Sequence, residues 1–165
     1  MDVLQIDIIY GGRMSLEEYD KKRNFAISPE PKSGSDIGTG EHIAKIFVIH
    51  EHHSLHHHWD LRLEICGTLK SWAVPKEPPT EKGLKRLAIQ VEDHPMEYAN
   101  FEGVIPKGNY GAGKVVIWDN GTFLLEERND NKLVFKLDGR YINGRYALIK
   151  APNMGKNSWL FFKTK

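Results

Sequence analysis

Nine short segments rich in β-branched and aromatic residues follow one another from residue 43 to the end of the chain. Turn-forming residues separate them, and no helical pattern intervenes. We therefore expect an all-β-dominated fold of about eight or nine strands, which favours a β-barrel or a β-sandwich. The segments are IFVIH (46–50), WDLRLEI (59–65), LKSWAV (69–74), RLAIQVE (86–92), KVVIWD (114–119), GTFLLEE (121–127), KLVFKL (132–137), RYALIK (145–150) and SWLFFKT (158–164).

Asn-Gly and Asp-Gly pairs indicate where neighbouring strands turn. Asn120-Gly121 is the strongest of these signals, because a type I′ hairpin turn needs positive φ at both central positions. We predict a hairpin there, between the strands VVIWD and TFLL. Asp138-Gly139 and Asn143-Gly144 predict further turns.

The residues before the strands have a different character. Ser15 with Glu18 three positions later forms a capping-box pattern, which predicts a short N-terminal helix in residues 15–24. Residues 28–40 are rich in Pro, Gly and Ser, so they are expected to form a long surface loop.

The length of 165 residues, with 40% hydrophobic and 27% charged residues, fits one globular domain, expected over residues 15–165. Residues 1–14 stay unassigned as an N-terminal extension. No apolar run approaches the roughly 20 residues that cross a bilayer, and Asp2 and Asp7 interrupt the first apolar stretch, unlike a secretory signal. The lone Cys66 agrees with a reducing compartment. We expect no membrane association and a cytoplasmic location.

The net charge of +1 lacks the basic excess of a strong non-specific nucleic-acid binder. Two local basic patches, DKKRNF (20–25) and KGLKR (82–86), are interpreted first as solvated surface. Global charge therefore indicates no partner.

Six of the eight histidines lie within residues 50–58. In HWDLRLEI (58–65) every second residue is apolar, so a strand there has one core face and one polar face. The same alternation in IFVIHEH (46–52) places His50 and His52 on the polar face. The polar face of the second strand carries His58, Asp60, Arg62 and Glu64.

A loop near residues 53–57 has hairpin length and would pair these two strands antiparallel, with facing Cβ atoms about 5 Å apart. His52 would then lie opposite or diagonal to His58 and Asp60. Two imidazoles and a carboxylate on rigid strands make a three-ligand site with open positions, suited to catalytic Mn²⁺, Fe²⁺ or Zn²⁺. Arg62, one strand step beyond Asp60, offers the planar fork that holds phosphate, so the pattern predicts a metal beside a phosphoryl substrate.

Other polar motifs are weaker when taken alone. His53, His56 and His57 are interpreted as loop residues. His94, in the turn-forming segment VEDHPMEY (91–98), is by itself more typical of a structural histidine. PKGNYGAGK (106–114) is glycine-rich but precedes a strand instead of a helix, so it predicts a tight turn or bulge and not a phosphate-binding loop.

Four blocks resemble, in the right order, the 3′-phosphoesterase domain of bacterial DNA ligase D, which also occurs as a stand-alone archaeal protein. The resemblance runs from about Tyr19 to the C-terminus. It implies a compact closed β-barrel of about eight strands, with a short N-terminal helix, long loops and the active site on an outer groove. The blocks are FVIHEHHSLHHHWDLRLE, LKSWAVPK, RLAIQVEDHPMEYANFEGVIPKGNYGAG and VVIWDNGTF.

The resemblance implies a Mn²⁺-dependent enzyme, with other divalent transition metals as possible substitutes. Such an enzyme removes a 3′-terminal ribonucleoside from a primer strand and then hydrolyses the remaining 3′-phosphate during end-joining repair. It implies a primer-template end as substrate, DNA ligase, primase-polymerase and Ku-type proteins as partners, and a monomer.

Carried over position by position, the resemblance makes His52, His58 and Asp60 the metal ligands, in agreement with the strand argument. The catalytic set becomes His94, Arg62 and Tyr98, with Arg23, Asn24 and Glu30 of KRNFAISPEP. The residues expected to bind the substrate phosphate are Arg23, Arg62, His94, Lys76 and Arg86.

Two positions depart from the family pattern. Asn24 stands where the family commonly has Asp, which puts the catalytic step served by that carboxylate, such as the monoesterase step, in question. His50 stands where the family has Gln, and it is expected to support the metal ligands from behind or to act as an additional ligand, either of which would alter metal preference.

Two other functions compete with this one. His58 and Asp60 have the His-x-Asp spacing of a non-haem Fe(II) oxygenase, although the Arg that a 2-oxoglutarate enzyme needs about ten residues after a later histidine is missing after His94. The third hypothesis is a non-catalytic module that holds a metal and binds nucleic-acid ends.

Overall fold

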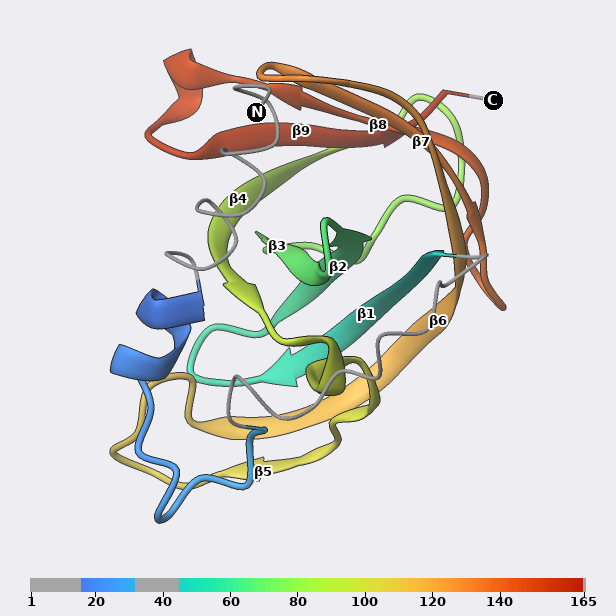
Figure 1. Ribbon diagram of the computed structural model, residues 1–165. Coiled ribbons are helices and arrows are strands. Elements are labelled where there is room, and N and C mark those ends of the chain that lie inside the picture. Colours follow the sequence, from blue (N-terminus) through green and yellow to red (C-terminus); the bar gives the residue numbers. More distant parts are fainter. Residues whose placement is uncertain (1–15, 32–44, 165) are drawn as a thin grey trace, which may run out of the picture.

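A computed structural model describes residues 16–31 and 45–164 (Figure 1). A short helix covers residues 16–21, as predicted; Ser15 and most of the predicted loop over residues 28–40 lie outside the described residues. The strands are β1 Lys45–His53, β2 His58–Ile65, β3 Thr68–Val74, β4 Lys85–His94, β5 Gly103–Ile105, β6 Gly113–Asn129, β7 Lys132–Asp138, β8 Asn143–Lys150 and β9 Ser158–Lys163, with 3-10 helices η1 Met96–Asn100 and η2 Pro152–Met154.

Eight of the strands close into an antiparallel barrel. They run in the order β1-β2-β3-β4-β9-β8-β7-β6, and pairing of β1 with β6 closes the ring (Figure 1). The ninth strand, β5, pairs with the beginning of β6 outside that ring. The predicted β-barrel is confirmed, and β5 is an element that the sequence pattern did not predict.

The predicted hairpin at Asn120-Gly121 is wrong, because β6 continues through both residues. Asn120 pairs with Val48 of β1 and Gly121 with Phe47, after which β6 pairs with β7. A Cβ atom on Gly121 would lie 1.9 Å from the carbonyl oxygen of Asp138. The glycine thus permits a close backbone approach between strands and does not make a turn.

The other turn predictions have mixed outcomes. Asp138-Gly139 ends β7 at a turn, as predicted, whereas Asn143-Gly144 is the beginning of strand β8 and the prediction of a turn there is wrong. The pair with positive φ at both positions is Cys66-Gly67, at 55° and 76°, between β2 and β3. These angles are those of a type I′ hairpin turn.

Side-chain alternation separates two apolar clusters across the barrel wall. The first fills the barrel and includes Leu61 and Leu63 of β2 with Trp72 and Phe135. The second lies outside the wall, where residues from the helix, η1, β5 and the barrel pack together: Tyr19, Val48, Leu69, Tyr98, Ala99, Phe101, Ile105 and Val115. The polar faces of β1 and β2 lie on this outer side.

Candidate metal centre and its pocket

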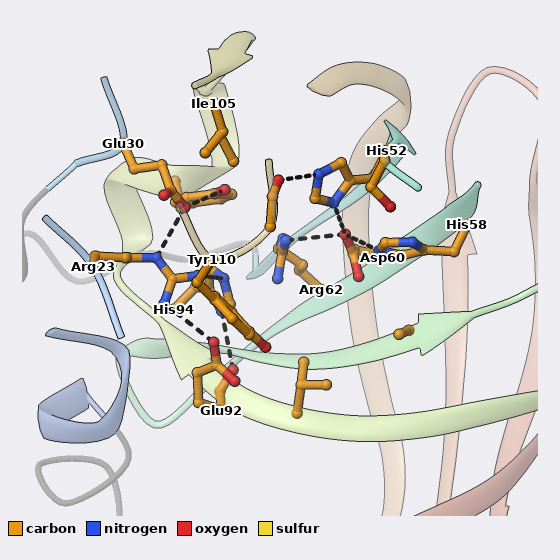
Figure 2. A pocket seen from close by; sticks show the side chains of 15 residues that line it. Arg23, Glu30, His52, His58, Asp60, Arg62, Glu92, His94, Ile105 and Tyr110 are labelled. Atoms are coloured by element: carbon orange, nitrogen blue, oxygen red, sulfur yellow. Dashed lines mark hydrogen bonds and ion pairs between the residues drawn. The ribbon is translucent and has the colours of Figure 1, made fainter. Parts of the chain in front are cut away.

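The polar faces of β1 and β2 meet as the alternation predicts. His52 pairs directly with His58, and His50 pairs with Asp60. The Oδ2 atom of Asp60 lies 3.6 Å from His52 Nδ1 and 3.3 Å from His58 Nε2 (Figure 2). Bonds of about 2.1 Å to one ion would hold neighbouring ligand atoms roughly 3.0–3.4 Å apart, so the three donors have nearly the spacing of a metal site.

Backbone carbonyls fix the tautomer of both rings, that is, which ring nitrogen carries the hydrogen. His52 Nε2 donates to the carbonyl oxygen of Gly111 at 2.6 Å, and His58 Nδ1 donates to that of His56 at 2.7 Å. In the neutral rings, the remaining nitrogens therefore present lone pairs to the Asp60 carboxylate. Lone pairs that face a carboxylate require a cation between them, and this arrangement is typical of histidine metal ligands.

The charges around Asp60 support the same conclusion. Burial alone would raise the pKa of this carboxyl, but Arg62 and the two histidines lower it well below its usual value. Burial opposes protonation of His58, yet its hydrogen bond to Asp60 raises the pKa of the ring. The centre is thus organised around a negative charge that attracts a proton or a metal ion.

Arg62 is held by three partners. Its Nε donates to His50 Nδ1 at 3.1 Å, one terminal nitrogen donates to Ser71 Oγ at 2.9 Å, and the other lies 3.4 Å from Asp60. His50 can accept this bond because its Nε2 carries the proton and donates to the carbonyl oxygen of Phe101 at 3.0 Å. Burial, followed by the charge of Arg62, lowers the pKa of His50 to about 3, so the ring stays neutral.

Arg23 lies across the pocket in an equally dense set of contacts. Its Nε donates to Glu30 at 2.9 Å, one terminal nitrogen donates to Glu92 at 3.1 Å, and the other donates to His94 Nε2 at 3.1 Å. Tyr98 donates its hydroxyl to Glu30 at 2.8 Å. The segment that carries Arg23 and Glu30 is thereby joined to β4 and η1, which are distant in sequence.

His94 is a neutral ring in this arrangement. Its Nε2 accepts from Arg23, and its Nδ1 donates to the carbonyl oxygen of Glu92 at 3.0 Å. Burial, then the charges of Arg62 and Arg23, lower its pKa well below the usual histidine value. Burial likewise raises the pKa of the Tyr98 phenol well above its usual value, against the charge of Arg62.

These side chains line one pocket on the outer face of the barrel, the close-up in Figure 2. It contains every residue predicted as a metal ligand, together with Arg23, Glu30, Arg62, His94 and Tyr98. The other residues that line it are Ser54, Ala73, Val91, Glu92, Ile105, Tyr110 and Gly111.

Four predicted residues are not among those that line this pocket: His50, which lies behind Arg62, and three others. Asn24 is exposed and its side-chain oxygen accepts the backbone N–H of Ala26 at 3.1 Å. Lys76 is exposed, and Arg86 donates to the carbonyl oxygen of Glu77 at 2.9 Å. The described contacts therefore do not support the expectation that these three residues serve the centre.

Among the pocket residues that were not predicted from the sequence, Glu92 and Tyr110 contribute a charge and an aromatic ring. Glu92 is buried and accepts from Lys22 at 3.0 Å as well as from Arg23; its position two residues before His94 on β4 was the available signal. Tyr110 belongs to the glycine-rich segment that was predicted only as a turn. Lys22 Nζ lies 4.9 Å from the centroid of its ring.

A second groove adjoins the pocket at Tyr110, which lines both. We call it the basic groove, because Lys21, Lys22, Arg23 and Lys107 line it with Asn24, Ile27, Gly108 and Asn109. The barrel thus presents a candidate metal centre, two arginines and a cationic extension on one face.

Comparison with known proteins identifies the chain. The family model of the DNA ligase D 3′-phosphoesterase domain matches residues 50–150. The chain belongs to the DNA ligase D 3′-phosphoesterase family. This membership confirms the resemblance in the sequence.

Members of this family are found within much longer proteins. The chain is 44% identical over 156 residues to the multifunctional non-homologous end joining protein LigD of Pseudomonas aeruginosa, covering 91% of this chain and 18% of the relative. It is 45% identical over 154 residues to the multifunctional non-homologous end joining DNA repair protein LigD of Mycobacterium tuberculosis, covering 91% and 20%. The chain therefore spans about a fifth of the length of these LigD relatives.

No helix among the described residues is both long and apolar enough to cross a membrane.

Proposed function

We propose that this protein is a metal-dependent 3′-phosphoesterase that heals DNA ends in end-joining repair. It would remove a 3′-terminal ribonucleoside from a primer strand and then hydrolyse the resulting 3′-phosphate, with Mn²⁺ as its metal. The observation that carries the proposal is the convergence of His52, His58 and Asp60 beside the buried guanidinium of Arg62. Family membership supports the same chemistry.

Phosphate ester cleavage needs neutralisation of charge on the non-bridging oxygens. A divalent ion held by His52, His58 and Asp60 would supply Lewis-acid polarisation of the phosphoryl group. Arg62 and Arg23 are the cations that bind the phosphoryl oxygens, because both line the pocket. His50 accepts a hydrogen bond from Arg62 at Nδ1 and thereby orients it. His50 thus contributes to the centre from behind.

His94 begins as a proton acceptor. Its neutral ring cannot donate from Nε2, so it acts as an acid toward the leaving oxygen only after it takes up a proton. An anionic phosphoryl group bound to Arg23 and Arg62 would favour that uptake, because it offsets the two charges that lower the pKa of His94.

The basic groove suits the rest of the primer strand. Its lysines offer charge to backbone phosphates, and the half-exposed Tyr110 offers a ring face to a base at the entrance of the pocket. Both relatives named above are described as end-joining proteins, so DNA ligase, primase-polymerase and Ku-type proteins are the proposed partners.

The test is a primer-template assay with a single 3′-terminal ribonucleotide, Mn²⁺ and sampling over time. The expected result is loss of a nucleoside followed by release of phosphate, both abolished by a chelator. Accumulation of the 3′-phosphate without its release would mean that Asn24 does not sustain the monoesterase step. An intact primer after prolonged incubation would contradict the proposal.

A further inference from the structure

The β1–β2 hairpin carries a second cluster of metal-ligand side chains on its other face. Glu51 and His53 alternate along β1 with His50 and His52, so they point away from the first centre. His57, just before β2, completes the cluster. We call Glu51, His53 and His57 the outer cluster.

The three donor atoms of the outer cluster lie within 4.8 Å of one another. Glu51 Oε1 lies 3.0 Å from His57 Nε2 and 3.5 Å from His53 Nε2. A tetrahedral ion with bonds of about 2.05 Å keeps its ligand atoms roughly 3.3 Å apart, and the two measured separations lie on either side of that value. Glu51 thus has the spacing of a metal ligand from each histidine, and side-chain rotation would complete the site.

Ring contacts hold the two imidazoles beside Glu51, and the nearly parallel rings would have to rotate about χ2 to direct both nitrogens at one ion. The ring centroids of His53 and His57 are 4.6 Å apart with an interplanar angle of 20°, and those of His57 and Trp59 are also 4.6 Å apart. Trp59 is itself packed against the barrel core. The rings are therefore anchored to the barrel, although both histidines are exposed.

We propose that Glu51, His53 and His57 form a second divalent-metal site, distinct from the phosphoesterase centre, that clasps the β1–β2 hairpin. Two imidazoles and one carboxylate with a solvent-open position suit Zn²⁺ or a similar late first-row ion. The bound ion joins the end of β1 to the residue before β2 across loop 54–57. Because His58 follows His57 directly, the clasp also limits motion of a ligand of the first centre.

The stoichiometry of Zn²⁺ binding to the chelator-treated full chain tests this proposal. Equilibrium dialysis at micromolar Zn²⁺ should give two ions for the wild type and one for His57→Ala and for Glu51→Gln. His56→Ala is the matched control, because it removes a neighbouring loop histidine outside the cluster, and it should keep two. The same number of ions in the wild type and in both cluster variants, or equal losses in His56→Ala and His57→Ala, would overturn the proposal.

Thermal unfolding separates the outer site from the first centre. In a His52→Ala background, Zn²⁺ should still raise the Tm by several degrees, and adding His57→Ala should abolish that shift. An equal shift in both variants would contradict a clasp at His57. Neither measurement uses phosphoesterase activity, so its result stands whether or not the proposed function holds.

Discussion

His50 shows how one hydrogen-bonding residue can replace another behind the centre. Its ring donates to Phe101 and accepts from Arg62, and the amide of the glutamine common in the family could make the same two bonds. We expect His50→Gln to keep phosphate release within about threefold of wild type. A loss of two orders of magnitude in the primer assay would show that the imidazole itself is needed.

The same substitution should change the response to acid. The folded pKa of His50 is about 3, against about 6.5 when unfolded, so the unfolded state binds more protons between these values. Stability is therefore complete above pH 6.5 and falls as the pH drops below it. Metal-free urea unfolding at pH 7 and pH 5 should show a loss smaller by roughly 2 kcal/mol in His50→Gln. Identical losses would contradict a buried neutral His50.

Arg62 should not tolerate lysine. Its fork contacts His50, Ser71 and Asp60 with three different nitrogens, whereas one ammonium group cannot reproduce that geometry. Arg62→Lys is expected to lower kcat/KM for a 3′-phosphorylated primer by roughly 100-fold. Activity near that of wild type would show that a point charge suffices.

At the scale of the elements, Asp119 of β6 holds the β7–β8 loop. Its carboxylate accepts the backbone N–H groups of Asn120, Arg140, Tyr141 and Ile142 at 2.8–2.9 Å. Asp119→Ala leaves these donors without their acceptor, and we expect a loss of about 3 kcal/mol in urea unfolding. Asp138→Ala, on the exposed end of β7, serves as the control, and equal effects would contradict the assignment.

The β1–β2 hairpin could be predicted because its alternation is local and its apolar face is continuous. The continuation of β6 through Asn120-Gly121 could not be predicted in this way, because the need for glycine there arises from the Asp138 carbonyl on another strand. The contacts of Arg23 with His94 likewise depend on how a distant segment packs on β4. Only the family resemblance placed Arg23 and His94 in one site. Nothing in the local sequence pattern indicated Tyr110 as a pocket residue.

At the scale of the whole molecule, the barrel interior is apolar and the candidate metal centre lies on its outer wall. If the primer follows the basic groove, Lys107→Ala should weaken primer-template binding and reduce the slope of log K against log salt by about one. Lys156→Ala, an exposed lysine beyond η2, is the matched control. Equal slopes for the two variants would place the strand elsewhere.

The most direct test of the proposed metal centre compares two histidines of the same hairpin. Release of phosphate from a 3′-phosphorylated primer with Mn²⁺ should be unchanged in His56→Ala, which lies outside the pocket, and should fall at least roughly 100-fold in His52→Ala. His52→Ala with Mn²⁺-dependent activity near that of wild type would contradict the account.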